Sequence, residues 1–157
     1  MDELQNLFKT LIVSDYSIRI LHWKIIGMDF GTKHELMDEY HSKLNEFIDE
    51  VGEVILMNGG SIPSLAEVIS DGFKTLNAEE DYNAGAVIKL AKLLLSATLN
   101  EYEKVTNSDI PSDIKSKLEE HMYWIRKELQ YKLTRHLEPT QAASEALTEF
   151  CDSMVIK

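Results

Sequence analysis

The sequence lacks most features of secreted, membrane-spanning or disulfide-linked proteins. It has one cysteine, Cys151, which excludes an internal disulfide and any metal site built from several cysteines. It has no run of about 18 apolar residues, the length that crosses a membrane. Its N-terminus opens with two acids, Asp2 and Glu3, instead of the basic segment of a signal peptide. We therefore expect a cytoplasmic protein that does not contact a membrane.

Basic residues are also scarce. Lys and Arg total 16 against 27 Asp and Glu, which gives a formal net charge of -11. A surface of this sign repels the phosphate backbone of nucleic acids unless the basic residues are segregated. They are spread along the chain, and neither end carries a basic tail. We therefore expect no direct binding to DNA, whereas metal cations suit such a surface.

Residues that interrupt regular structure are few. Glycine and proline number 7 and 3, and the chain contains no low-complexity tract and no internal repeat. With 44% hydrophobic residues, a chain of 157 residues can bury one ordinary core. We expect a single domain over residues 1–157.

The hydrophobic pattern predicts helices throughout. Apolar residues recur at three- and four-residue steps, the period of an amphipathic helix, and no alternating strand pattern competes with them. A capping box of Thr32 and Glu35 marks one helix start, and Ser64 with Glu67 marks another. We expect helices over about 4–27, 33–57, 64–70, 83–105 and 112–137, followed by a short C-terminal helix after Pro139.

The order of these helices predicts the fold. Four are long, and a short one lies in the long connection between the second and the third. This is the arrangement of an all-α, ferritin-like four-helix bundle, here with a short C-terminal helix added. A fold alone does not define a function, which depends on the residues of a site.

The helix expected over residues 33–57 carries two pairs of candidate metal ligands at four-residue spacing. His34 and Asp38 form one pair, and Asp49 and Glu53 form the other. This spacing places two side chains on one helical face, where both can reach one ion. The alternative is a solvated acidic face, because most such pairs on an acidic helix bind water only.

The two pairs cannot complete one site within one chain. His34 and Glu53 are 19 residues apart, which is about 28 Å along a helix that rises 1.5 Å per residue. Two copies of this helix packed antiparallel about a two-fold axis would solve the problem. The residue numbers of His34 and Glu53 add up to 87, as do those of Asp38 and Asp49, so each pair would meet across the axis. We expect two equivalent sites per dimer.

Two further histidines lie near this surface. His22 shares a helical stripe with Ile18 and Ile25 and should face the same buried side. It is either a hydrogen-bonded core histidine, the commoner role of such a residue taken alone, or, beside the other four groups, a fifth ligand. His41 faces Glu46 of the partner subunit by the same sum, which predicts a hydrogen bond across the axis.

The pattern that begins at His22 resembles the ferroxidase motif of the Dps family, the miniature ferritins. That motif is His-x11-His-x3-Asp-x10-Asp-x3-Glu, and its five positions are all met here, by His22, His34, Asp38, Asp49 and Glu53. The neighbouring residues agree too: Leu21-His22-Trp23, His34-Glu35-Leu36 and the pair Gly59-Gly60. The strong part of the match covers about residues 21–60.

The resemblance implies a function. It implies a hollow homo-oligomer, a dodecamer built from two-fold dimers, in which the five motif residues bind Fe(II) and act as the catalytic ferroxidase site. Hydrogen peroxide or dioxygen would oxidise the iron, and the shell would store the ferric mineral, a role in iron storage and in defence against oxidative stress. Carboxylates with imidazole and no thiolate suit iron, although zinc or manganese could occupy the same ligands.

Two rival functions differ in their requirements. A di-iron oxygenase of the ferritin-like kind needs Glu-x-x-His pairs, and none of the five histidines has a glutamate three residues before it. A metal-free structural or DNA-packaging shell would keep the dimer and lose ferroxidase turnover. A salt-sensitive DNA shift without iron oxidation would indicate this second rival.

Overall fold

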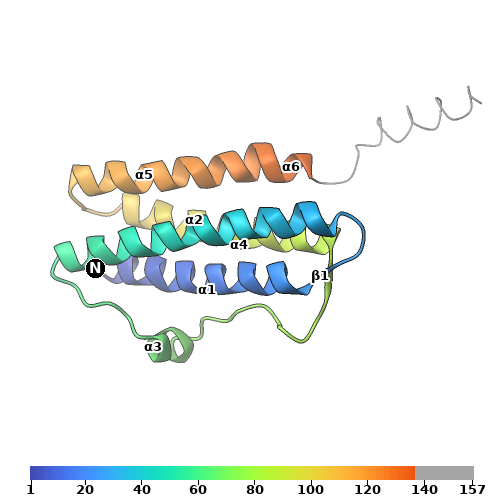
Figure 1. Cartoon of the computed structure of the whole chain (residues 1–157). Coiled ribbons are helices and arrows are strands. Elements are labelled where there is room, and N and C mark those ends of the chain that lie inside the picture. The colour runs from blue at the N-terminus through green and yellow to red at the C-terminus, as the bar shows by residue number, and fades with distance from the viewer. Residues whose placement is uncertain (137–157) are drawn as a thin grey trace, which may run out of the picture.

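The computed structural model describes residues 1–136; the predicted C-terminal helix after Pro139 and Cys151 lie outside this range. Four long helices are packed side by side (Figure 1). They are α1 (Asp2–Lys24), α2 (Phe30–Met57), α4 (Ala84–Thr106) and α5 (Ser112–Lys127), and the short α3 (Leu65–Ser70) lies between α2 and α4. The predicted order of four main helices with a short helix in the crossover is confirmed.

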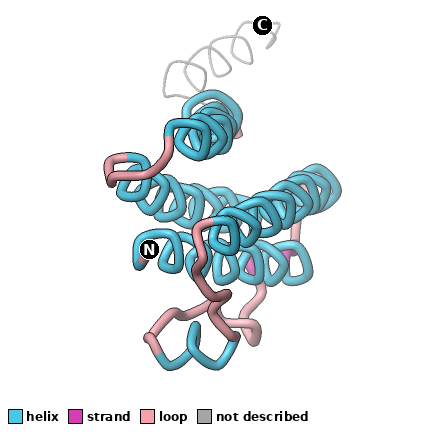
Figure 2. The backbone as a smooth tube through the Cα atoms, turned by 90° about the vertical axis from the view of Figure 1, so that its left-hand side faces the viewer, coloured by secondary structure: helices cyan, strands magenta, loops and turns pink. Residues whose placement is uncertain are grey.

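The apolar faces of the long helices meet in one core. α1 packs most extensively against α2 and α4, and α5 packs against α4. Leu11, Leu44, Leu95 and Leu118, one from each long helix, are fully buried. Burying such a side chain stabilises the fold by about 1.5–3 kcal/mol. Figure 2, a view along the helices, shows α3 and its loops outside the four long helices, next to α1.

The connection between α2 and α4 is held by hydrogen bonds near both of its ends. Ser64 and Glu67 form the predicted capping box at the start of α3, with Ser64 N donating to Glu67 Oε2 over 2.6 Å. Further along, the two-residue strands β1 (Ile25–Ile26) and β2 (Tyr82–Asn83) pair in parallel, with Ile25 opposite Tyr82. These strands were not predicted, because two residues are too few to show an alternating pattern. They join the end of α1 to the start of α4.

The start of α2 differs from the prediction. The helix begins at Phe30, three residues before the expected Lys33, so Thr32 lies inside the first turn and the predicted Thr32–Glu35 capping box is wrong. The preceding Asp29 has a φ of 63°, and Gly27 has a φ of 93°. These left-handed residues reverse the chain sharply enough for the helix to start at once.

The last long helix contains an irregularity that its sequence did not reveal. α5 continues into a π-helical turn, η1 (Glu128–Lys132), and then into α6 (Leu133–Arg135). A π-helical turn inserts extra backbone into a helix and rotates the residues that follow it. Here it accompanies a buried carboxylate, Glu128, which is 3% exposed.

Within residues 1–136, no helix is long and apolar enough to cross a membrane.

Candidate metal-binding site

The end of α1 and the start of α2 bring His22 and His34 together. Their ring centroids are 3.7 Å apart, and His22 Nδ1 lies 3.1 Å from the backbone carbonyl oxygen of His34. A carbonyl oxygen only accepts, so Nδ1 must carry the proton and donate. His22 Nε2 then keeps its lone pair, and an N–H donated to a backbone carbonyl is the usual way to orient a metal-binding histidine.

Asp38 lies one turn after His34 on α2 and shares a small pocket with His22. The pocket has a volume of about 120 Å³ and is lined by Arg19, His22, Trp23, Asp38 and His41. Asp38 is exposed, whereas His22 and His34 are half-buried. One chain therefore brings three of the five predicted ligands to the same end of the bundle.

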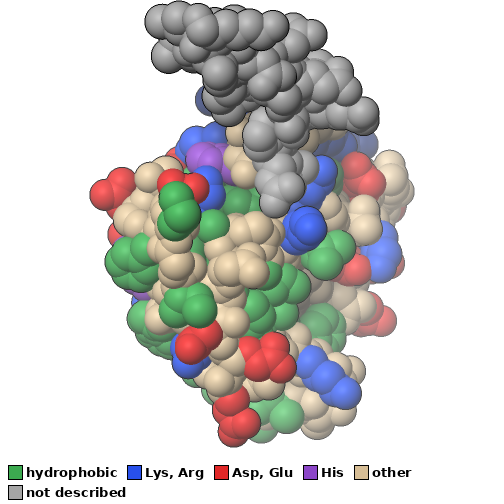
Figure 3. All heavy atoms as spheres, turned by 90° about the vertical axis from the view of Figure 1, so that its right-hand side faces the viewer, with side chains coloured by type: hydrophobic (Ala, Val, Ile, Leu, Met, Phe, Trp, Pro, Cys, Tyr) green, Lys and Arg blue, Asp and Glu red, His purple; other side chains and the backbone are tan. Residues whose placement is uncertain are grey.

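The surface around this end is partly hydrophobic. Figure 3 views it directly and shows hydrophobic side chains among acidic and basic ones. Four large apolar side chains near the candidate ligands are exposed: Trp23, Ile26, Met28 and Phe30. Exposed apolar side chains that gather in one region commonly mark a surface that another protein covers.

The other two predicted ligands lie elsewhere along α2. Asp49 and Glu53 are exposed on the same helix, and Glu53 follows His34 by 19 residues, about 28 Å of helix. Within residues 1–136, no three His, Cys, Asp or Glu side chains come close enough to hold a metal ion. A single chain thus carries the two halves of the predicted site apart from each other.

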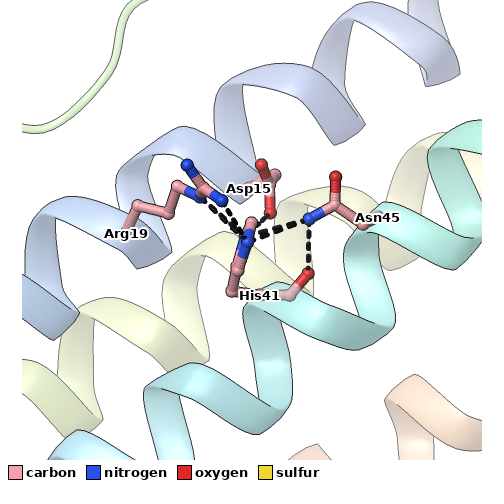
Figure 4. Close-up of polar contacts among 4 residues, drawn as sticks. All are labelled: Asp15, Arg19, His41 and Asn45. Atoms are coloured by element: carbon pink, nitrogen blue, oxygen red, sulfur yellow. Dashed lines mark hydrogen bonds and ion pairs between the residues drawn. The ribbon is translucent and has the colours of Figure 1, made fainter.

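His41 belongs to a polar network that the sequence did not predict (Figure 4). Its Nδ1 lies 2.5 Å from Asp15 Oδ1, and its Nε2 lies 2.5 Å from Arg19 Nη2. Because guanidinium only donates, Nε2 must accept and Nδ1–H must donate to Asp15. Burial raises the pKa of the Asp15 carboxyl, and the hydrogen bond from His41 opposes this rise. Both ring nitrogens are thus bonded within the chain, which leaves neither for the predicted bond to the partner's Glu46.

A second network fills the interior between α2, α4 and α5. His121 Nε2 donates to Glu50 Oε2 over 2.5 Å, and the Tyr102 hydroxyl donates to His121 Nδ1 over 2.8 Å. The His121 ring also stacks on Phe47, with centroids 4.0 Å apart. Burial lowers the pKa of His121, although Glu50 opposes this effect. These contacts satisfy a buried neutral imidazole and explain the residue without a metal.

Sequence relatives are distant but consistent with one another. No protein-family model matches the chain. The DNA protection during starvation protein of Streptococcus suis is 27% identical over 139 residues, which is 80% of each chain. The protein of the same name from Listeria innocua is 40% identical over 58 residues, which is 37% of each chain.

Solved structures share the fold over most of the chain. Mycobacterium smegmatis Dps superposes with a TM-score of 0.77 at 22% identity and covers 88% of this chain and 86% of its own. Dps92 of Deinococcus radiodurans gives 0.78 at 18% identity, with 90% and 87% covered. A Listeria innocua Dps with two histidine-to-glycine substitutions, twelve residues apart, gives 0.73 at 23% identity, with 80% and 86% covered.

The structural neighbours establish that the chain has the ferritin-like fold. The curated relatives are similar to the chain in sequence and belong to one group of proteins. The relatives in Streptococcus suis and Listeria innocua carry the same name, and the structural neighbours from three bacteria are all Dps proteins. The helix order, including the short α3 in the crossover, agrees with both. This chain therefore has the fold of the Dps proteins and a distant sequence similarity to the curated DNA protection during starvation proteins.

Proposed function

We propose that the protein is a ferroxidase that binds Fe(II) between two subunits, oxidises it with hydrogen peroxide or dioxygen and stores the ferric product inside a hollow homo-oligomer. The observation that carries this proposal is the pairing of His22 with His34, in which a backbone carbonyl orients His22 and leaves its Nε2 free. Metal-binding histidines usually donate their other ring N–H in this way, to a carbonyl oxygen or a carboxylate.

The proposed ligand set comes from two chains. His22, His34 and Asp38 of one subunit would face Asp49 and Glu53 of the partner subunit, as antiparallel packing of α2 about a two-fold axis requires. Imidazole and carboxylate together suit iron, and zinc or manganese would compete for the same groups. The 19 residues of α2 between His34 and Glu53, about 28 Å of helix, support this shared arrangement over an intramolecular site.

Two bound iron ions would reduce peroxide without releasing hydroxyl radical. Two Fe(II) supply two electrons, so one hydrogen peroxide and two protons give two water molecules and two Fe(III). A single Fe(II) supplies only one electron, and the cleaved peroxide then releases hydroxyl radical. The carboxylates would stabilise the rising charge of the oxidised metal.

The comparisons support the same residues and role. The Listeria innocua Dps variant lacks two histidines at twelve-residue spacing, which is the spacing of His22 and His34. The Streptococcus suis relative is named for DNA protection during starvation. Removing Fe(II) and peroxide protects DNA without contact, which suits a chain with a net charge of -11.

Subunit complementation tests the shared site. One variant carries His34→Ala with Asp38→Ala, and the other carries Asp49→Ala with Glu53→Ala. Each homodimer has no complete site, whereas a mixed dimer regains one: the second variant supplies His34 and Asp38, and the first supplies Asp49 and Glu53. Co-assembled shells should therefore recover peroxide-driven Fe(II) oxidation that both parent shells lack.

The native protein is the reference for this experiment. Anaerobic titration should reach about two Fe(II) per subunit, the number that a two-electron peroxide reaction needs, and a peroxide pulse should give soluble ferric mineral. Failure of co-assembled shells to recover activity would contradict the shared site. No Fe(II) binding by the native protein, together with a salt-sensitive DNA shift, would instead favour a metal-free DNA-packaging shell.

A further inference from the structure

The pocket beside the proposed iron ligands contains two groups that the ferroxidase pattern does not include. His22 and Asp38 line it as ligands, but Arg19 and His41 line it as well. Its volume of about 120 Å³ is enough to hold a few water molecules. A pocket of this size suits a small inorganic molecule.

Neither extra group can serve as an iron ligand as it stands. Arg19 has a guanidinium that stays protonated and cannot coordinate a metal. The two ring nitrogens of His41 are already bonded, Nδ1 to Asp15 and Nε2 to Arg19. A cation beside a site for Fe(II) is electrostatically unfavourable, since like charges repel. Arg19 therefore has either a structural role, through His41 and the Trp23 ring 5.9 Å from its Cζ, or a different role in the reaction.

The network fixes the guanidinium in place. Arg19 Nε lies 2.9 Å and Nη2 lies 2.5 Å from His41 Nε2, and Asp15 holds the other side of the same ring. Asp15 and His41 themselves are mostly buried, with side chains 14% and 16% exposed. Arg19 also lines the pocket, and among the described residues its Nη1 takes no part in the bonds to His41.

We propose that Arg19 binds hydrogen peroxide in this pocket, with His41 and Asp15 as positioning residues, so that the site favours peroxide over dioxygen. This inference rests on the proposed ferroxidase function. The peroxide oxygens accept hydrogen bonds from guanidinium, and charge develops on them as the O–O bond breaks. A fixed donor at that place lowers the barrier. Dioxygen is apolar and accepts such bonds poorly.

The reaction balances with the components named. The O–O bond of one peroxide breaks, two Fe(II) each lose one electron, and the two resulting hydroxide groups take up two protons from the buffered solvent to give two water molecules. Arg19 keeps its proton throughout, since its charge is what stabilises the developing anions. His41 keeps the proton that it shares with Asp15.

A structural tie between α1 and α2 is the competing explanation. Asp15 and Arg19 lie on α1 and His41 lies on α2, so the network also joins two helices. A tie of this kind would affect folding, shell assembly and both oxidants to the same extent. A peroxide-binding residue would instead change the ratio of the two oxidation rates.

The test compares Arg19→Gln with native protein. Stopped-flow absorbance would follow Fe(II) oxidation in intact shells, once with peroxide under anaerobic conditions and once with dioxygen. We expect the peroxide-to-dioxygen rate ratio to fall by about 10- to 100-fold, at or below the lower limit of the effect seen when a buried transition-state donor is removed. The KM for peroxide should rise, anaerobic Fe(II) stoichiometry should stay the same, and spin-trapped hydroxyl radical should increase.

Matched variants separate binding from folding. Arg126→Gln removes another half-exposed arginine, one paired with Glu103 over 3.0 Å, and should leave the rate ratio unchanged. Arg19→Lys keeps the charge but loses the fixed fork of donors, so it should also lower the ratio, and it replaces Arg19→Gln if that variant fails to assemble. His41→Gln should raise the KM for peroxide more than it lowers kcat.

The outcomes distinguish this inference from the function on which it rests. Native oxidation with an unchanged rate ratio in Arg19→Gln and Arg19→Lys would overturn the peroxide site alone. An equal loss with both oxidants would leave only the structural tie and would overturn it as well. No oxidation by the native protein with either oxidant would overturn the proposed ferroxidase and this inference together.

Discussion

The hydroxyl of Tyr40 on α2 donates a 2.9 Å hydrogen bond to Oε2 of Glu128 in the π-helical turn of α5. Glu128 is only 3% exposed, and its one cationic neighbour among the described residues is Lys132, at 3.5 Å. A buried carboxylate needs such donors, because losing them leaves its charge without compensation. Burial and the adjacent Glu128 carboxylate raise the pKa of Tyr40, so the phenol keeps its proton and remains a donor.

Tyr40→Phe should therefore destabilise the protein. The substitution keeps the ring and removes only the donor to Glu128, so we expect a loss of about 1–3 kcal/mol in the free energy of unfolding. Urea unfolding at a fixed protomer concentration measures it, since the stability of an oligomer depends on concentration. Tyr123→Phe is the control: Tyr123 is 72% exposed, and its change should stay within about 0.5 kcal/mol. Equal effects of the two substitutions would contradict a role for the buried bond.

The His121 network should make stability depend on pH. The pKa of His121 is lowered from its ordinary value of 6.5, chiefly by burial. The unfolded chain then binds a proton at higher pH than the folded chain. The contribution of His121 is complete above about pH 6.5 and is lost as the pH falls from 6.5 toward the lowered pKa, with a slope of at most about 1.4 kcal/mol per pH unit.

His121→Gln provides the comparison for this pH dependence. Urea unfolding of metal-free protein between pH 7 and pH 5 should show a shallower fall in stability for the variant than for native protein. Glu50 contributes lower down: partial burial acts to raise its pKa, but hydrogen bonds from His121 and Lys117 together lower it from 4.5. Its stabilising effect is present above about pH 4.5 and is lost as the pH falls further. Parallel curves for the two proteins above pH 5 would show that His121 is not the group that titrates.

The sequence predicted the main helices because their buried faces repeat at the helical period, as Leu4, Leu11 and Ile18 of α1 illustrate. It predicted the pairing of His22 with His34 through their place in a motif, since nothing local to either histidine signals the other. The start of α2 was missed because its capping signal lies one turn inside the helix, while Gly27 and Asp29 determine the turn. Turn geometry of this kind depends on tertiary contacts as well as on local residues.

The polar networks could not be predicted from spacing. Asp15 and Arg19 meet His41 at separations of 26 and 22 residues, and His121 meets Glu50 at 71. Each contact depends on the orientation of two helices about their own axes. The hydrophobic period defines this orientation only to within a broad face of the helix. The π-helical turn at Glu128 could not be predicted either, because its local sequence is typical of an ordinary α-helix.

His22→Ala should weaken metal binding more than substitution of a histidine outside the proposed ligand set. His22 Nε2 is the lone pair that the carbonyl of His34 orients outward, so its loss should lower Fe(II) affinity at least about tenfold. Anaerobic calorimetric titration measures the affinity. His136→Ala is the control, since His136 contacts Lys33 over 2.7 Å at the other side of the start of α2. Native affinity in His22→Ala would remove His22 from the ligand set and leave it as a packed core histidine.

The end of α2 requires glycine at one position for steric reasons. Gly60 N donates to the Ile55 carbonyl oxygen over 2.9 Å, which draws the chain back against the helix. A Cβ at Gly60 would lie 2.9 Å from Ile55 Cγ2 and 3.1 Å from that carbonyl oxygen. The second contact is with backbone, which cannot rotate away as a side chain does.

Gly60→Ala should therefore lower the free energy of unfolding by about 1–3 kcal/mol, the usual cost of overpacking. Gly52→Ala, inside α2, is the control: its Cβ would meet Phe8 at 3.4 Å and Ile62 at 3.7 Å, which is ordinary contact. Alanine also favours helix over glycine by about 1 kcal/mol, so Gly52→Ala should be neutral or slightly stabilising. Urea midpoints with equal m-values would compare the two. A Gly60→Ala protein as stable as native would show that the chain after α2 can move away from Ile55, and that the return of the chain there is not fixed by packing.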